Sequence, residues 1–200
     1  MEPKSRIIEE ARGQLMKYGY SRMRMDDLAY SLGMSKKTLY QHFAGKEELC
    51  EAVTDNICTM HKCAINQIMG EKIDFIARLR KISAFISTNA MQIGNDIMMD
   101  FKRNVPLLWQ KIEEFRKESI HTDFKNLIQK GVNEGVFRAD INVDLVLAMY
   151  YGSIKHIISP ENLQNANYTP LEAFNSIFRI IMEGMMTEEA RKEFANSFKI

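Results

Sequence analysis

Residues 24–49 read RMDDLAYSLGMSKKTLYQHFAGKEEL, and this stretch decides how the N-terminal part of the chain folds. The pattern predicts two very short helices on either side of Gly33, with Ser35 as the N-cap of the second, Lys36–His42. Two lysines and a threonine fall in the first turn of that second helix, where side chains of a groove-bound helix reach base edges. A helix this short and polar is not stable alone. We therefore predict that the protein holds it outward to contact DNA.

The charge distribution supports this interpretation. The net charge of the 200 residues is only +1, but residues 1–46 hold nine Lys/Arg against five Asp/Glu, a net of +4. Residues 47–200 hold the remaining eighteen against twenty-one, a net of −3. A basic end on a mildly acidic body fits an electrostatic footprint confined to one module.

The rest of the composition favours an all-α protein in the cytoplasm. Hydrophobic residues make up 46% of the chain, whereas only four prolines and ten glycines interrupt it. No apolar run approaches the roughly 20 residues of a membrane-spanning helix, and the first residues lack the apolar stretch of a signal peptide. The three cysteines form no CxxC pair, so we expect reduced thiols and no metal site.

Working outward from residues 24–49, the apolar spacing predicts further helices. The first runs from about Lys4 to Tyr18 and stops at Gly19, and a long fourth helix, up to Gly70, connects the N-terminal module to the body. The body continues with amphipathic segments, one of which begins at Pro106. Residues 143–159 and 170–186 carry apolar side chains on more than one side, which is typical of helices buried both in their own core and against a partner.

At these residues the chain resembles the tetracycline-repressor (TetR) family of bacterial transcription regulators. The resemblance is carried by Leu32-Gly33-Met34-Ser35, by the block Thr38-Leu39-Tyr40-Gln41-His42-Phe43 and by Lys46-Glu47-Glu48-Leu49. It covers residues 6 to about 53 and continues more weakly in the body, through Gly131-x-x-x-Gly135-x-Phe137-Arg138. The resemblance implies a three-helix helix-turn-helix domain at residues 1–46 and a helical effector-binding and dimerisation domain at residues 47–200.

The resemblance also implies which residues contact operator DNA. Arg24 stands where the family often has a Thr or Ser that caps the second helix, so here a cap is lost and a charge that reaches a phosphate is gained. The expected DNA-binding residues are Arg24, Lys36, Lys37, Thr38, Tyr40, His42 and Lys46. The alternative for the lysines is an ordinary solvated helix face.

The body is rich in methionine, Met91 among fourteen in the chain, and in aromatic residues. Such side chains are able to line an adaptable apolar pocket for a small hydrophobic effector, although the same residues also build ordinary cores. The predicted ligand-binding residues are Phe85, Met98, Phe101, Trp109, Phe124, Tyr150 and His156, with Asp100 as a second polar group.

Enzyme motifs give no competing interpretation. The sequence contains no P-loop, GxGxxG or GxSxG, and its one Glu-x-x-His, at Glu118 and His121, is not the paired set of a di-iron bundle. We therefore expect no catalytic residues, no cofactor and no enzyme activity. The favoured function is a homodimeric repressor that pairs through 143–159 and 170–186 and is released from a palindromic operator by its effector. The alternatives are an effector-independent DNA-binding dimer, and a helical small-molecule-binding protein or enzyme with an idle helix-turn-helix module.

Overall fold

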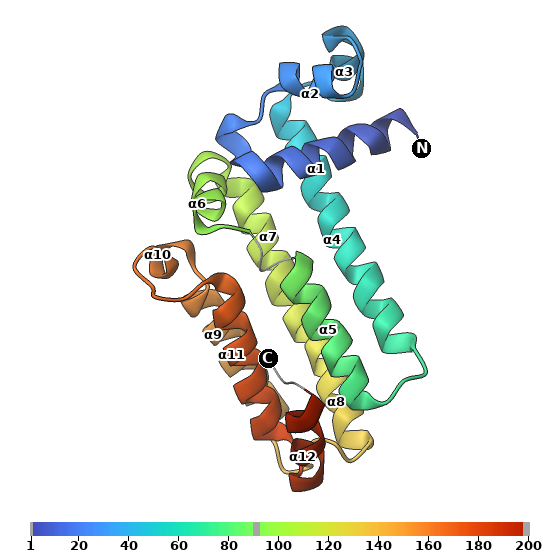
Figure 1. Ribbon diagram of the computed structural model, residues 1–200, viewed down its shortest axis with the longest axis vertical. Helices are drawn as coiled ribbons and strands as arrows, with labels where there is room; N and C mark the ends of the chain where they lie inside the picture. The colour runs from blue at the N-terminus through green and yellow to red at the C-terminus, as the bar shows by residue number, and fades with distance from the viewer. Residues whose placement is uncertain (1, 90–92, 198–200) are drawn as a thin grey trace. The chain divides into compact units, whose positions relative to one another are not determined.

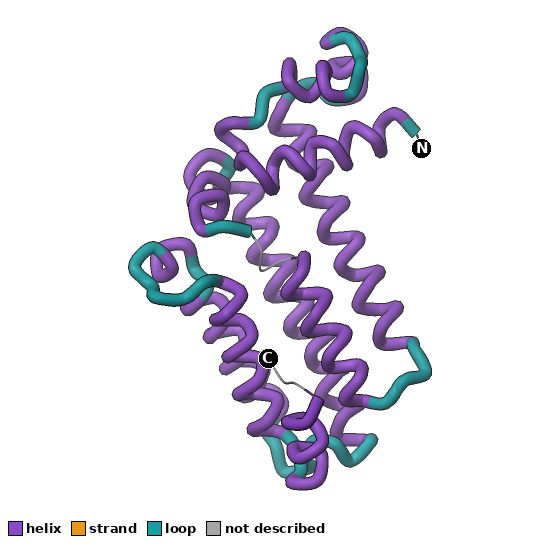
Figure 2. The backbone as a smooth tube through the Cα atoms, viewed as in Figure 1, coloured by secondary structure: helices purple, strands orange, loops and turns teal. Residues whose placement is uncertain are grey.

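The computed structural model describes residues 2–89 and 93–197, so Met91 lies outside the described residues. Helices and loops make up this part of the chain (Figure 2), together with an isolated β-bridge between Phe137 and Met186. The structure thus confirms the all-α class. It separates into two compact units, unit 1 with residues 1–61 and 93–115 and unit 2 with residues 62–92 and 116–200. The two units are described one after the other.

Unit 1 contains the N-terminal helices in the predicted order (Figure 1). They are α1 (Pro3–Arg22), α2 (Met25–Ser31), α3 (Lys36–His42) and the first part of α4 (Lys46–Gly70). Their inward faces form one apolar core, as the helical spacing of Ile7, Ala11 and Leu15 predicts. Leu28, Leu39, Phe43 and Leu49 complete the core from the other helices.

The end of α1 differs from the prediction. Gly19 does not stop the helix, because the chain kinks there, with φ 80° and ψ 175°, and makes one further turn to Arg22. A positive φ of this size is adopted readily only by glycine. The kink has a partner outside the N-terminal helices, since the carboxylate of Asp100 lies against it.

Unit 1 also takes in a segment from the middle of the chain. Helix α6 (Asn95–Asn104) packs along α1, and α7 (Pro106–Ser119) begins in this unit, with Pro106 in its first turn as predicted. Phe101 of α6 and Leu108 of α7 pack against the N-terminal core. Farther along α7, Lys111 pairs with Glu51 and Asp55 of α4 at 3.2 and 2.6 Å.

Unit 2 forms the body. Its helices are α5 (Phe75–Asn89), α8 (Lys125–Asn133), α9 (Val143–Ile157), α10 (Pro160–Leu163), α11 (Pro170–Met185) and α12 (Glu188–Ser197), and the ends of α4 and α7 also belong to it. Helices α9 and α11 pack on each other. Each has a side-chain cap: the Asn142 side chain accepts from the Leu145 amide at 3.0 Å, and Thr169 forms a capping box with Glu172.

Gly131 lies near the end of α8, where aromatic side chains pack closely against the backbone. A Cβ on Gly131 would lie 2.3 Å from the ring of Phe137 and 2.7 Å from that of Phe75. Those two rings stack edge to face with centroids 5.1 Å apart. Gly131 therefore has no side chain because two aromatic rings fill the space.

Three elements were absent from the sequence prediction. After α9 the chain forms the short helix α10, with Pro160 in its first turn and Ser159 as its cap. After α11 the chain forms α12. Between α7 and α8, residues Ile120–Phe124 adopt a π-helical turn. None of these short or irregular elements has an apolar period long enough to recognise in the sequence.

Candidate nucleic-acid interface

The turn between α2 and α3 is fixed by backbone hydrogen bonds around one glycine. Gly33 has φ 66° and donates its amide to Tyr30 O at 3.0 Å, and the Met34 amide donates to Ala29 O, also at 3.0 Å. This pattern is the usual glycine-dependent end of a helix. The local sequence therefore sets the angle at which α3 leaves α2.

Helix α3 is capped as predicted, and two buried side chains anchor it. The Ser35 hydroxyl accepts from the Thr38 amide at 3.1 Å, and its oxygen lies 2.8 Å from the Thr38 hydroxyl. Leu39 and Phe43, four residues apart, point inward and are 0% and 1% exposed. The buried pair turns the opposite face of α3 toward solvent.

Three of the predicted DNA-binding residues are exposed on α3, and we call their side chains the outward face of α3. Lys36 and Lys37 are exposed, and Tyr40 is 49% exposed. Lys36 is not a lone charge, because its Nζ lies 2.6 Å from a carboxylate oxygen of Asp26 in the first turn of α2. This ion pair links the starts of the two helices.

Three further predicted residues of the module are less exposed. Thr38 and His42 are half-buried, and the Thr38 hydroxyl already contacts Ser35. Lys46 is half-buried too, with its Nζ 4.2 Å from the ring centroid of Tyr20. Burial lowers the pKa of Lys46, while the neighbouring Asp100 and Cys50 oppose that change.

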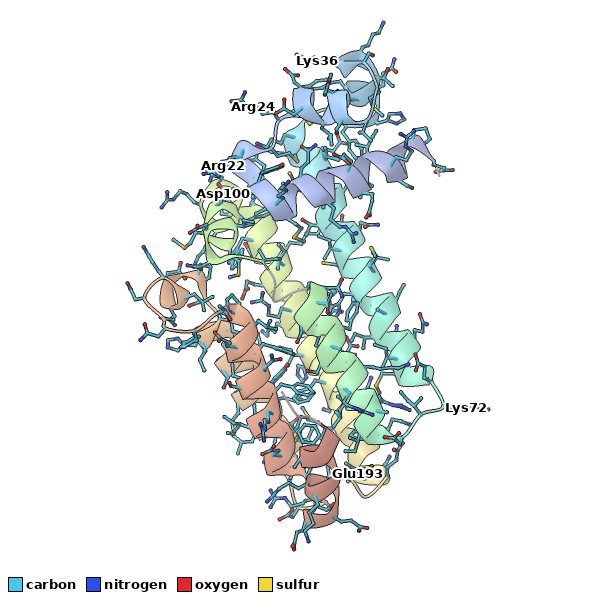
Figure 3. The ribbon with its side chains drawn as sticks, viewed as in Figure 1. Arg22, Arg24, Lys36, Lys72, Asp100 and Glu193 are labelled. Carbon is cyan, nitrogen blue, oxygen red and sulfur yellow. The ribbon has the colours of Figure 1, made fainter. Side chains whose placement is uncertain are left out.

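Arg24 is exposed and occupies the N-cap position of α2 without any side-chain capping bond, in keeping with the predicted loss of a cap. Arg22 also lies at the surface of the module (Figure 3). Sequence reasoning missed Tyr30 of α2, which is 87% exposed. Its signal was available, since a tyrosine directly after the buried pair Leu28-Ala29 must face away from the core.

The predicted ligand-binding residues are divided between the two units. Met98 is buried and Phe101 half-buried in α6, and Trp109 is half-buried in α7; all three belong to unit 1. Unit 2 holds the other four. There, the rings of Phe124 and Tyr150 are in contact, with centroids 4.5 Å apart. Phe85 is half-buried and His156 is exposed.

Two open depressions lie on the described surface, and both are polar. The first, of about 350 Å³, is in unit 1 beside the end of α1. The second, of about 230 Å³, is in unit 2 at the π-helical turn, where burial raises the pKa of Asp123. The first is lined by Ser21, Asp96, Met99, Asp100, Arg103 and Asn104. The predicted aromatic residues line neither depression.

Both the N-terminal and the C-terminal part of the chain match a known protein family. The family described as bacterial regulatory proteins, tetR family, matches residues 7–53. The family described as YsiA-like protein, C-terminal region, matches residues 64–184, which is more than half of the chain.

Individual relatives agree. An uncharacterised HTH-type transcriptional regulator of Bacillus subtilis (strain 168), YvaF, is 25% identical over 185 residues, covering 92% of this chain and 96% of that protein. The fatty acid metabolism regulator protein of the same organism is 21% identical over 189 residues, covering 90% and 93%. Among solved structures, FadR from Bacillus subtilis in complex with stearoyl-CoA has a TM-score of 0.59 at 18% identity, covering 90% of this chain and 98% of that one.

In the described residues, no helix combines the length and the apolar character that crossing a membrane requires. The capped α3 with its buried inner face, the turn at Gly33 and the two family matches lead to one conclusion. The chain belongs to the tetR family of bacterial regulatory proteins and is a helix-turn-helix, DNA-binding regulator of transcription.

Proposed function

We propose that the protein is a homodimeric repressor that binds a palindromic operator in the cytoplasm and leaves it when a hydrophobic effector binds. The observation that carries the proposal is the outward face of α3, where Lys36, Lys37 and Tyr40 lie over the buried Leu39 and Phe43. In this proposal residues 1–46 are the DNA-binding domain, and residues 47–200 bind the effector and form the dimer.

On DNA, α3 enters the major groove. Lys37 has the reach and donors to bind guanine O6 and N7, and Tyr40, with an apolar ring and a hydroxyl, suits the edge of the groove beside a phosphate. Arg24, Thr38, His42 and Lys46 flank this face. In a two-fold dimer the two α3 helices would lie about 34–36 Å apart, one turn of B-DNA.

The dimer forms through α9 and α11. Leu145 and Met149 lie one turn apart on α9 and are 58% and 57% exposed, and Ile180 of α11 is 70% exposed. The other sides of these helices hold the buried residues Leu147 and Met182. Apolar side chains on two faces of adjacent helices support a four-helix interface with a second copy of the chain.

For the effector we propose a long-chain acyl thioester. Support comes from the relatives, since one is a fatty acid metabolism regulator and a solved neighbour holds stearoyl-CoA. Within unit 2, the predicted residues Phe85, Phe124 and Tyr150 supply apolar surface for an acyl chain. Effector and DNA would oppose each other through a coupling of about 1–3 kcal/mol.

Fluorescence anisotropy with a labelled duplex from the gene's own upstream region tests the proposal. Binding should weaken steeply with salt, and stearoyl-CoA should weaken it by about 5- to 150-fold at fixed salt. Stearate and free coenzyme A are the controls for detergent action and for the headgroup. If stearoyl-CoA leaves DNA affinity unchanged, the result would favour a DNA-binding dimer that needs no effector. If the protein shows no salt-sensitive binding to DNA, the result would favour a small-molecule-binding protein or enzyme with an idle helix-turn-helix module.

A further inference from the structure

The kink at the end of α1 holds a carboxylate from a distant part of the sequence. Oδ2 of Asp100, in α6, accepts from the Ser21 amide at 2.8 Å, and the Ser21 hydroxyl donates to Oδ1. Asn104, one turn farther along α6, donates to Asp100 Oδ1 at 2.8 Å and to Ser21 Oγ at 3.0 Å. We call these contacts of Ser21, Asp100 and Asn104 the α1–α6 joint.

Gly19 makes the joint possible in two ways. Its φ of 80° turns the chain so that the following amides face α6. A Cβ at this position would come within 2.7 Å of Asp100 Oδ2, so any side chain would push the carboxylate away. Consecutive amides turned in this manner form a concave site for a negative charge.

The charge state of Asp100 agrees with this geometry. Burial opposes its ionisation, but the hydrogen bonds from Ser21, Asn104 and the Tyr20 backbone outweigh burial and hold the pKa of Asp100 below its ordinary value. Apolar contact reinforces the joint, since the ring of Phe101 meets that of Tyr20 edge to face at 6.4 Å. The joint therefore combines hydrogen bonds to the Asp100 carboxylate with a neighbouring contact between two aromatic rings.

The path of the chain explains why the α1–α6 joint affects the orientation of the N-terminal helices. The chain leaves the N-terminal helices along α4 and returns to unit 1 only at residues 93–115. The N-terminal helices share one apolar core with the start of α4, so their orientation changes whenever α4 bends beyond that core. The joint adds a second support through α6, and α2 follows the end of α1 after only Met23 and Arg24.

We propose that Asp100 is a positioning residue for operator binding: its contacts with Ser21 tie the DNA-binding module to α6, so that bending of α4 does not reorient it, and they fix the spacing of the two α3 helices in this way. This inference rests on the proposed DNA-binding function. Loss of the joint would leave each α3 able to bind its half-site. It would remove the preference of the dimer for one distance between half-sites.

The test compares Asp100→Ala and Ser21→Ala with Asp96→Ala, a matched control because Asp96 is exposed on the same helix and lines the same depression. Each full-length variant is titrated against duplexes with the native half-site spacing, with one base pair added or removed, and against a single half-site. We expect the unchanged protein and Asp96→Ala to lose about tenfold in affinity or more on the altered spacings, which is about 1.4 kcal/mol. Asp100→Ala and Ser21→Ala should lose little of their remaining affinity there and bind the half-site normally.

A double variant separates positioning from simple destabilisation. If Asp100 acts through Ser21, the doubly substituted protein should show the same spacing tolerance as either single variant. Hydrogen exchange in peptides covering residues 19–23 should rise in Asp100→Ala while α9 and α11 keep their protection.

Equal spacing discrimination in Asp100→Ala and Asp96→Ala would overturn the inference in a protein that binds DNA. Unchanged exchange at residues 19–23 would overturn it whether or not DNA binds. Failure of the unchanged protein to bind any duplex would instead contradict the proposed function.

Discussion

Two polar contacts in unit 1 differ in how far along the chain their partners lie. Asp26 and Lys36 are ten residues apart and connect α2 with α3, within the segment that decides the fold. Ser21 and Asp100 are 79 residues apart and connect α1 with α6. The ion pair between Asp26 and Lys36 lies on the surface of the helix-turn-helix, which forms from residues that are close in the sequence. The second joins α1 to a part of the chain that local patterns do not reveal, and in the proposal above it orients this surface.

Replacing both Lys37 and Tyr40 with Ala should produce the largest change, because it removes the outward face without touching the joint. Loss of two groove contacts at about 1–3 kcal/mol each would weaken operator binding by about 30-fold or more, on every half-site spacing. Anisotropy titrations measure this. Lys72→Ala, at an exposed lysine of the α4–α5 loop, is the control and should bind as the unchanged protein does. A double variant that keeps its affinity would mean that α3 is not the recognition helix.

Gly131→Ala should destabilise unit 2 without a direct effect on the α3 face. Its Cβ would overlap the rings of Phe137 and Phe75, and overpacking of this kind costs about 1–3 kcal/mol. Gly13→Ala, in α1 and with open space around it, should instead be neutral or stabilise by up to about 1 kcal/mol. Chemical denaturation of both variants checks the contrast. Equal stability of the two variants would refute the packing explanation for Gly131.

The substitution Asp26→Asn tests the local contact, because it removes the charge that pairs with Lys36. Without its carboxylate partner, Lys36 would offer its full charge to a phosphate, while the first turn of α2 keeps a residue of similar shape. Exposed ion pairs are worth about 0.2–1 kcal/mol, so affinity for non-specific DNA should rise by no more than about fivefold. Titration against an unrelated duplex measures the change. Weaker binding would indicate that the ion pair is needed to orient α3.

A pH series tests the distant contact and should give the smallest effect. Because the pKa of Asp100 is lowered in the folded protein, its contribution is present above the ordinary carboxyl value of about 4 and is lost as the pH falls through the folded value. The stability difference between the unchanged protein and Asp100→Asn should therefore shrink between pH 7 and pH 3. Urea unfolding at each pH measures it. A difference that stays constant or grows in acid would contradict the assigned charge state.

The contrast between the two contacts also explains what the sequence was able to predict. Ser35, Gly33 and Pro106 mark helix ends through their own backbone chemistry, so the helix-turn-helix and the start of α7 follow from local residues. Leu39 and Phe43 identify the inner face of α3 by their spacing. Gly33, Ser35, Leu39 and Phe43 are also among the residues that carry the resemblance to the tetR family.

Features with distant partners were not predictable in this way. Gly19 looks like a helix stop until Asp100 is placed beside it. The ion pair of Lys36 and the cation–π contact of Lys46 with Tyr20 depend on how helices pack, so the exposure of each lysine was unknown from the sequence. The predicted ligand-binding residues were chosen for their chemistry alone, which does not say in which unit they lie.

The salt dependence of operator binding by Lys37→Ala is the most direct test of the central claim, that α3 presents its outward face to DNA. If Lys37 contacts a phosphate or the groove as a cation, the slope of log K against log salt should become shallower by about one in this variant. The slope should be unchanged in Lys72→Ala. A Lys37→Ala protein with the affinity and slope of the unchanged protein would contradict the account.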